Sequence, residues 1–270
     1  MITKASTDDT GCTMERTDWL SILPTPSGAP AEPLIIAAVG AGGKTMTLHD
    51  LMDLYALAGW RSVLTTTARI YTEPGMATDT ENLLVQLERT SRCVFAHPID
   101  NQFAGNLSEE DWVFLRTYTE MLLIEGDDAL DRPLKMPTAD EPNIPPDADR
   151  LLIVCGMSAI GKPLQDVCFN FEGALEVIRA KMGAKYTGAS LVTPAMAAQL
   201  IIAGYLDNSR VTAVFGDRMK ESVLVIFNQA DYKERVRDAQ TIRRLLPRGM
   251  QTVITSNQHL YTGGQGHYKA

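Results

Sequence analysis

A glycine-rich turn between an apolar run and a helical pattern constrains this chain more than any other feature. Residues 34–39 read LIIAAV, residues 40–45 read GAGGKT, and MTL follows. Because three residues of the turn are glycines, its backbone N–H groups can approach a ligand without obstruction by side chains. The positive end of the following helix, the charge of Lys44 and the hydroxyl of Thr45 are typical of sites that hold phosphates and magnesium. We therefore predict a di- or triphosphate site at Gly40, Ala41, Gly42, Gly43, Lys44 and Thr45.

Two other interpretations of the turn stay open. A dinucleotide fingerprint would need glycine at Thr45 and an acidic residue at the end of the second strand, which instead ends in Thr65, Thr66 and Thr67. The turn can also be a plain glycine-rich connection without a ligand. Ala38 stands where the full phosphate-loop pattern has glycine, so the motif is the compact GxGGKT form. Lys-Thr at the correct place after an apolar strand favours phosphate binding.

Composition argues against several classes of protein. The chain has 270 residues, a formal net charge of −8 and no long block of Lys or Arg, so we expect no nucleic acid and no membrane among its partners. Its start, MITKASTDDTGC, lacks the apolar core of a signal peptide, and no apolar run reaches membrane-spanning length. The cysteines have no metal-binding spacing, which favours reduced thiols in a cytoplasmic protein. They are Cys12, Cys93, Cys155 and Cys168.

Apolar strand patterns alternate with amphipathic helical patterns along most of the chain. This alternation predicts one three-layer α/β domain, P-loop NTPase-like, with a mainly parallel sheet and the phosphate loop after its first strand. The domain would occupy residues 31–256, between a polar segment with a linker at 1–30 and a Gly-rich tail at 257–270. The expected later strands are 62–67, 93–96, 121–125, 151–155, 223–227 and 252–255. The expected helices are 46–58, 80–89, 108–116, 172–182, 194–203 and 233–246.

A second part of the site follows the apolar run MLLIE. Glu125 closes this run, and Asp127 and Asp128 come just beyond it. Carboxylates at the carboxyl edge of a parallel sheet lie in the crevice where such folds bind ligands. We predict that Thr45 and Asp127 organise Mg²⁺ and that Glu125 orients the attacking water or acceptor, with Asp128 less favoured. A solvated acidic turn is the alternative.

The proline-rich segment 127–146 is expected to form a lid or an acceptor-side loop over the phosphates. Its five prolines exclude a helix or a central strand. Arg132 and Lys135 can neutralise an anionic substrate there, or they can be ordinary surface charges. The hydroxyls of the threonine run 65–67 can reach phosphate or magnesium-bound water, although β-branched residues are also common fillers of strands.

A motif near the end of the chain suggests how the base of a bound nucleotide is recognised. After the run VLVIF comes Asn228-Gln229-Ala230-Asp231. GTP-binding proteins read guanine with an NKxD run in this position, and here Gln229 replaces the lysine. Asp231 can accept hydrogen bonds from the N–H donors of guanine, and adenine offers no matching donors. We predict that Asn228 and Asp231 read a purine, which leaves ATP and GTP as candidate ligands.

The order of six motifs resembles the accessory-protein family of selenium-dependent molybdenum hydroxylases (YqeC-like). The motifs are VGAGGKT, LTTTARI, IEGDDALDRPLKMPTADEPNIP, VCGMSAIGKPL, LVTPAMAAQLI and VIFNQAD. The resemblance places the family's phosphate loop, threonine run, acidic motif and basic loop on the residues already named. It places the family's G-K/R-P-L motif on Gly161, Lys162, Pro163 and Leu164. Asp128 and Asn170 stand where the family typically has glycine and arginine.

This resemblance implies a P-loop nucleotide-binding protein that acts in the maturation of a selenium-dependent molybdenum hydroxylase. We expect Mg-dependent hydrolysis of the nucleotide or transfer of its terminal phosphoryl group, with the hydroxylase or a cofactor-maturation protein as partner. The alternative is a non-catalytic nucleotide-sensing adaptor that docks to the hydroxylase or to a cofactor-handling partner. The departures at Asp128, Asn170 and Gln229 keep this alternative open.

Overall fold

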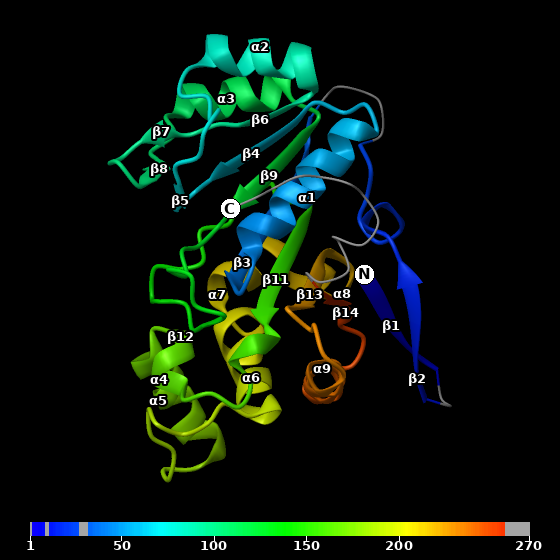
Figure 1. Cartoon of the computed structure of the whole chain (residues 1–270), viewed down its shortest axis with the longest axis vertical. Helices are drawn as coiled ribbons and strands as arrows, with labels where there is room; N and C mark the ends of the chain where they lie inside the picture. Colours follow the sequence, from blue (N-terminus) through cyan, green and yellow to red (C-terminus); the bar gives the residue numbers. More distant parts are fainter. Residues whose placement is uncertain (1, 9–10, 27–31, 257–270) are drawn as a thin grey trace.

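A nine-stranded sheet runs through the molecule, with the glycine-rich turn at the end of a central strand (Figure 1). The computed structural model describes residues 2–8, 11–26 and 32–256, with the side chains of 18–26 and 32–256. The predicted tail at 257–270 and part of the predicted linker lie outside the described residues.

The elements agree in order with the alternation read from the sequence. The strands of the large sheet are β1 (Ile2–Asp8), β2 (Gly11–Thr17), β3 (Leu34–Ala41), β4 (Ser62–Thr66), β6 (Arg92–Val94), β9 (Met121–Glu125), β11 (Arg150–Gly156), β13 (Val223–Asn228) and β14 (Gln251–Thr255). Short strands outside it are β5 (Arg69–Tyr71), β7 (His97–Pro98), β8 (Phe103–Gly105), β10 (Leu134–Lys135) and β12 (Cys168–Phe169). The α-helices are α1 (Lys44–Leu57), α2 (Thr80–Thr90), α3 (Glu109–Tyr118), α4 (Leu164–Val167), α5 (Phe171–Met182), α6 (Pro194–Ile201), α7 (Ser209–Phe215), α8 (Met219–Ser222) and α9 (Lys233–Leu245).

The strand order places the carboxyl ends of several parallel strands around the turn. The order is β2-β1-β14-β13-β11-β3-β9-β4-β6, and every pair from β14 to β6 is parallel. β3 therefore has β11 on one side and β9 on the other, so the residues that follow these three strands meet at one edge. β1 and β2 form an antiparallel hairpin. β1 also pairs with β14 in the antiparallel direction, so the hairpin extends the sheet beyond β14.

Alternate residues of the sheet enter two separate cores, which makes the fold three-layered. Ile36 and Ala38 of β3 pack with Leu48, Leu51 and the other buried residues of α1 on one face. The opposite face of the sheet, which includes Ile35, Ala37 and Val39 of β3, packs against α2, α3, α5, α6, α7 and α9. Figure 1 shows α1 lying across one face of the sheet. The predicted three-layer α/β architecture with a mainly parallel sheet is confirmed.

Two regions differ from the expected pattern. The segment 1–30, read as polar chain and linker, contains the β1–β2 hairpin, whose polar sequence carries no apolar strand signal. The segment 127–146 contains the two-residue strand β10, which pairs in parallel with β12.

Among the described residues, no helix is both long and apolar enough to span a membrane.

Candidate functional site

The predicted phosphate loop, Gly40–Thr45, has glycines at positions where neighbouring atoms leave no room for a side chain. Gly42 and Gly43 have φ values of +88° and +117°, a region that other residues rarely adopt. A Cβ atom on Gly42 would lie 2.5 Å from the Cα atom of Gly156, and one on Gly43 would lie 2.3 Å from Nδ2 of Asn228. The loop is therefore packed closely against β11 and β13.

The N-terminus of α1 is left without a side-chain cap. The helix begins at Lys44, and its N-cap residue is Gly43, which has no side chain to accept a hydrogen bond. The N–H groups of a first turn have no partner within the helix, and the helix dipole gives them partial positive charge. This end of α1 is therefore chemically suited to hold an anion such as phosphate.

The ammonium group of Lys44 is buried at the centre of the site. Its Nζ donates to the carbonyl oxygen of Gly40 at 2.8 Å and lies 3.1 Å from Asp127 and 3.6 Å from Glu125. Burial lowers the pKa of Lys44, but the charges of Asp127 and Glu125 outweigh that effect and the pKa is raised. Lys44 therefore carries a full positive charge at neutral pH.

Thr45 contacts Glu125, whereas the sequence pattern pairs it with Asp127 as a predicted magnesium ligand. The Thr45 hydroxyl donates to Oε2 of Glu125 at 2.9 Å, and no contact joins it to Asp127 among the described hydrogen bonds. Burial raises the pKa of Glu125, and the effects of Lys44 and Thr45 offset only part of this rise. A hydroxyl beside a carboxylate is a combination that Mg²⁺ accepts. The geometry favours Glu125 over Asp127 as the partner of Thr45.

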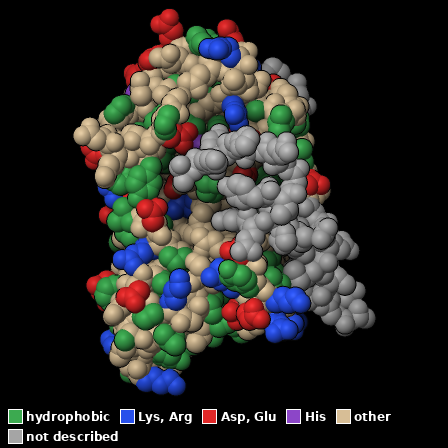
Figure 2. Space-filling model, viewed as in Figure 1, with side chains coloured by type: hydrophobic (Ala, Val, Ile, Leu, Met, Phe, Trp, Pro, Cys, Tyr) green, Lys and Arg blue, Asp and Glu red, His purple; other side chains and the backbone are tan. Residues whose placement is uncertain are grey.

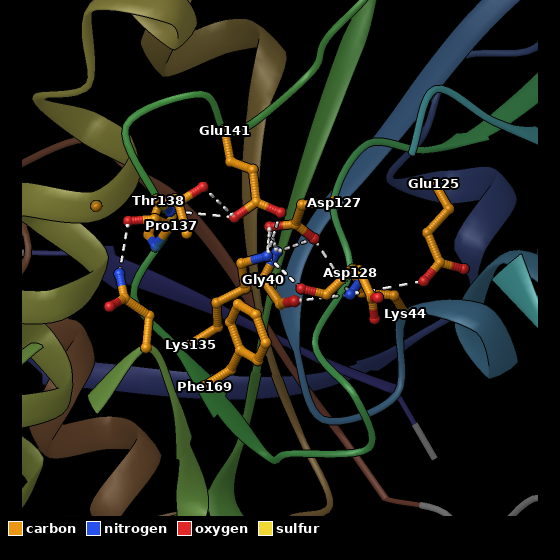
Figure 3. Close-up of polar contacts among 12 residues, drawn as sticks. Gly40, Lys44, Glu125, Asp127, Asp128, Lys135, Pro137, Thr138, Glu141 and Phe169 are labelled. Atoms are coloured by element: carbon orange, nitrogen blue, oxygen red, sulfur yellow. Dashed lines mark hydrogen bonds and ion pairs between the residues drawn. The ribbon is translucent and has the colours of Figure 1, made fainter. Parts of the chain in front are cut away.

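Asp127 lies deeper and contacts several elements at once (Figure 3). It is 0% exposed, and both of its oxygens accept from the backbone N–H of Gly40, at 3.1 and 3.0 Å. The hydroxyl of Tyr205 donates to it at 3.2 Å, and the ammonium groups of Lys44 and Lys135 lie 3.1 and 3.6 Å away. Asp127 thus joins the phosphate loop to β10 and to the helical segment around Tyr205.

The two cations predicted on the substrate side lie in different environments. The side chain of Lys135 is 0% exposed and its Nζ lies 2.8 Å from Oε1 of Glu141. The guanidinium of Arg132 is exposed and donates to the carbonyl oxygen of Asp166. Only Arg132 is therefore placed to meet an incoming anion without rearrangement. The lid role of segment 127–146 stays a prediction.

The three hydroxyls of the threonine run bind backbone carbonyl groups. They hold the end of β4 to the residue that follows β6, to β9 and to segment 127–146. The acceptors of Thr65, Thr66 and Thr67 are the carbonyl oxygens of Phe95 at 2.7 Å, Glu125 at 2.8 Å and Asn143 at 2.5 Å. These contacts give the run a structural role, and its predicted contact with phosphate stays a prediction.

The predicted base-reading residues also have partners within the protein. Asn228 donates from Nδ2 to the carbonyl oxygen of Gly42 at 2.8 Å, and its Oδ1 accepts from the hydroxyl of Thr255 at 2.7 Å. Asp231 accepts from the hydroxyl of Ser256 at 2.8 Å. Asn228 therefore positions the phosphate loop, and the reading of a purine by Asn228 and Asp231 stays a prediction.

The charges of the site leave an excess of carboxylates. Lys44 and Lys135 lie among Glu125, Asp127 and Glu141. In the part of the chain that the structure describes, no group of three or more His, Cys, Asp or Glu could hold a metal ion by itself. A magnesium ion here would need oxygen ligands from a bound phosphate in addition to Thr45 and Glu125. On the face shown in Figure 2, the described basic and acidic side chains are interspersed.

Two residues that contact the charged side chains of the site, Tyr205 and Glu141, could not be identified from a local sequence pattern. Tyr205 lies in a π-helical segment, Ile202–Leu206, that continues α6, and its hydroxyl is buried against Asp127. Burial, followed by the charge of Asp127, raises the pKa of Tyr205 well above its usual range. Glu141 lies within the proline-rich segment and pairs with Lys135. A π-helical turn is frequent at functional sites, but it is not readable from a pattern designed for α-helices.

Fold and site together define an α/β protein with a strand, a glycine loop, a buried lysine and facing carboxylates at the edge of a parallel sheet. The model of the YqeC protein family matches residues 36–172, which is half of the chain, and the chain belongs to this family. The uncharacterized protein YqeC of Escherichia coli (strain K12) is 29% identical over 143 residues, which are 50% of this chain and 56% of that protein. The match thus spans little more than half of the relative's length. No solved structure matches the chain.

Proposed function

We propose that this protein binds a magnesium–nucleoside triphosphate on the phosphate loop and acts as an accessory factor in the maturation of a selenium-dependent molybdenum hydroxylase. One observation carries the nucleotide site: the buried ammonium of Lys44 lies at the uncapped N-terminus of α1, beside Glu125 and Asp127. Such a lysine, together with first-turn N–H groups, matches the charge and shape of a polyphosphate. The client enzyme is suggested by the family resemblance.

Each residue has a distinct part in this proposal. Lys44 and the N–H groups of the loop bind the terminal phosphates, while Thr45 and Glu125 hold the magnesium ion. Magnesium, when bound, would neutralise charge on the phosphates. Asp127 keeps the loop in shape through the N–H of Gly40. In phosphoryl transfer most of the rate enhancement comes from positioning and charge neutralisation, which these groups supply.

Binding is tested by calorimetric titration of the parent with ATP and GTP in the presence of magnesium. Lys44→Ala should weaken the binding of either nucleotide at least about tenfold, because it removes the charge that faces the phosphates. Lys181→Ala is the matched control, since Lys181 is an exposed lysine of α5 and its loss should change nothing. Absence of binding to the parent, or equal binding by parent and Lys44→Ala, would overturn the nucleotide site.

A nucleotide-sensing adaptor without turnover is the second candidate. It is favoured by two neutral amides at positions where a cation is expected, Asn170 by the family resemblance and Gln229 by the NKxD pattern of GTP-binding proteins. Asn170 caps α5, and Gln229 accepts from the hydroxyl of Ser158. Fewer cations near the phosphates would leave less stabilisation for a transferring group. Steady-state phosphate release separates the candidates. Release that depends on Lys44 indicates an enzyme, whereas binding without such release indicates an adaptor.

A further inference from the structure

Lys135 is a second fully buried lysine beside the phosphate loop. Its side chain is 0% exposed, and its ammonium lies 2.8 Å from Glu141, 3.6 Å from Asp127 and 4.8 Å from the centre of the Phe169 ring. It also donates to the carbonyl oxygen of Asp128. A buried ammonium costs several kcal/mol unless charges compensate it, so Lys135 is fixed at this place by its carboxylate neighbours.

Asp127 is shared between two cations. Figure 3 shows Glu125 and Glu141 at opposite ends of the cluster, with Lys44, Asp127 and Lys135 between them. The ion-pair distances along this row are 3.6, 3.1, 3.6 and 2.8 Å. Negative and positive side chains therefore alternate along this row from Glu125 to Glu141. Asp127 is the only residue of the row that contacts both lysines.

Lys44 cannot bind phosphate without giving up part of its present contacts. An ammonium group has three N–H donors, and those of Lys44 face the carbonyl oxygen of Gly40, Asp127 and Glu125. When Lys44 turns toward a phosphate, the buried carboxylate of Asp127 loses a cation. An uncompensated buried carboxylate would oppose this movement.

We propose that Lys135 is a positioning residue for nucleotide binding, which keeps Asp127 compensated while Lys44 turns from Asp127 to the phosphates. This inference rests on the proposed nucleotide site. Lys135 touches neither phosphate nor metal in this scheme, and it acts through Asp127. Asp127 in turn keeps hold of the Gly40 N–H, so the loop retains its shape when the ligand enters.

The test separates this role from simple support of the fold. Lys135→Met alone would leave both Asp127 and Glu141 without Lys135, and a loss of stability could mask any other effect. The double variant Lys135→Met/Glu141→Gln removes the lysine together with one carboxylate, so the net charge of the cluster is unchanged. Glu141→Gln alone is its matched control, because this variant keeps the lysine beside Asp127.

Calorimetry with magnesium and the tighter-binding nucleotide gives the first readout. Lys135→Met/Glu141→Gln should bind about tenfold more weakly than Glu141→Gln at equal thermal stability, a coupling of ordinary size. Equal affinity of the two variants would overturn the role of Lys135. If the parent binds no nucleotide, the proposed function fails and the role of Lys135 in nucleotide binding fails with it.

The second readout is the exchange of lysine ammonium protons with solvent, followed by NMR with 15N-labelled lysine in the nucleotide-free protein. In Lys135→Met/Glu141→Gln, Lys44 becomes the only ammonium beside Asp127, so its protons should exchange several-fold more slowly than in Glu141→Gln. Unchanged or faster exchange would overturn the inference. Should the double variant fail to fold, the parent suffices: adding the magnesium nucleotide should slow exchange at Lys135, and faster exchange there would contradict its role.

Discussion

The two strands beside β3 contribute to the phosphate loop in different ways. On the β11 side, contact is steric: the carbonyl oxygen of Val154 would lie 2.2 Å from a Cβ atom on Gly40, and the backbone of Gly156 lies against Gly42. On the β9 side, contact is electrostatic: Glu125 ends the strand and Asp127 follows it, and both face Lys44. The β11 side constrains the loop by close packing, and the β9 side supplies the charges beside Lys44 and holds the N–H of Gly40 through Asp127.

This difference teaches which changes the site can tolerate. A backbone that fills the space of a missing Cβ leaves no alternative to glycine, so substitutions there should act as all-or-none defects. Charges act over a distance and share partners, so substitutions on the β9 side should produce graded effects. The predictions below test this contrast in order of decreasing effect on stability.

Gly42→Ala should be the most damaging change. The added Cβ would lie 2.5 Å from the Cα atom of Gly156 and 2.8 Å from the carbonyl oxygen of Pro133, at φ +88°. We expect a loss of about 4 kcal/mol in the free energy of unfolding, from steric overlap plus backbone strain, and no nucleotide binding. Urea denaturation followed by circular dichroism measures the loss.

Gly75→Ala is the matched control for this steric effect. Gly75 has the same φ value of +88°, but nothing lies within 4 Å of the place of its Cβ. Only backbone strain remains there, so a loss of about 1 kcal/mol is expected. If the two alanine variants lost the same stability, close packing of Gly42 against β11 would not be what requires glycine.

Asn228→Ala should have an intermediate effect on stability. Asn228 ends β13, on the side of the loop that is constrained by close packing. It removes the hydrogen bond to the carbonyl oxygen of Gly42 and leaves the hydroxyl of Thr255 without its acceptor. We expect a loss of about 2 kcal/mol in the free energy of unfolding and equal weakening of ATP and GTP binding. Thermal denaturation and calorimetry measure the two quantities. Selective loss of GTP binding would instead support the predicted reading of the base by Asn228.

Glu125→Gln should stabilise the protein while weakening magnesium-dependent binding. Burial raises the pKa of Glu125 above its ordinary value of 4.5, so the folded protein holds this proton more strongly than the unfolded chain. This contribution to stability is fully present below pH 4.5 and is lost as pH rises through the folded pKa. The variant avoids that loss, and we expect a gain on the order of 1 kcal/mol at pH 7.

Urea denaturation at several pH values checks the sign of this effect. The advantage of Glu125→Gln over the parent should shrink as the pH is lowered through 4.5, because below that pH Glu125 becomes protonated in both states. Glu88→Gln is the control, since Glu88 is exposed on α2 and its substitution should leave the unfolding free energy unchanged. An advantage that grew at low pH would show that the Glu125 charge supports folding.

The sequence predicts the main elements of the fold because their apolar runs are long and their order alternates. The strands Met121–Glu125 and Val223–Asn228 and the helix Lys233–Leu245 agree with their predictions to within one residue at each end. The hairpin of β1 and β2 could not be predicted in this way, because its sequence is polar and its strands are identified by their pairing with each other and with β14 rather than by a hydrophobic pattern.

The site was predictable only as far as local motifs reach. Lys44, Glu125 and Asp127 could be expected to meet, because residues that follow parallel strands gather at one edge of a sheet. Tyr205 could not, because it reaches Asp127 from a distant helical segment. Lys135 was identified as a cation near the site, but its burial depends on Glu141 and Phe169, which no spacing rule connects to it.

Arg132→Ala should have the smallest effect on stability and tests whether segment 127–146 has a function of its own. Arg132 is exposed and donates to a backbone carbonyl group, so its loss should change the free energy of unfolding by less than about 0.5 kcal/mol. If the segment covers the phosphates, this variant should release phosphate or bind its partner several-fold less well at unchanged nucleotide affinity. Such a result would extend the charged side of the site beyond β9, since Arg132 lies past Asp127 in the same segment. Parent-like behaviour in every assay would instead make this part of the segment an ordinary surface and would confine the charged side to the buried row from Glu125 to Glu141.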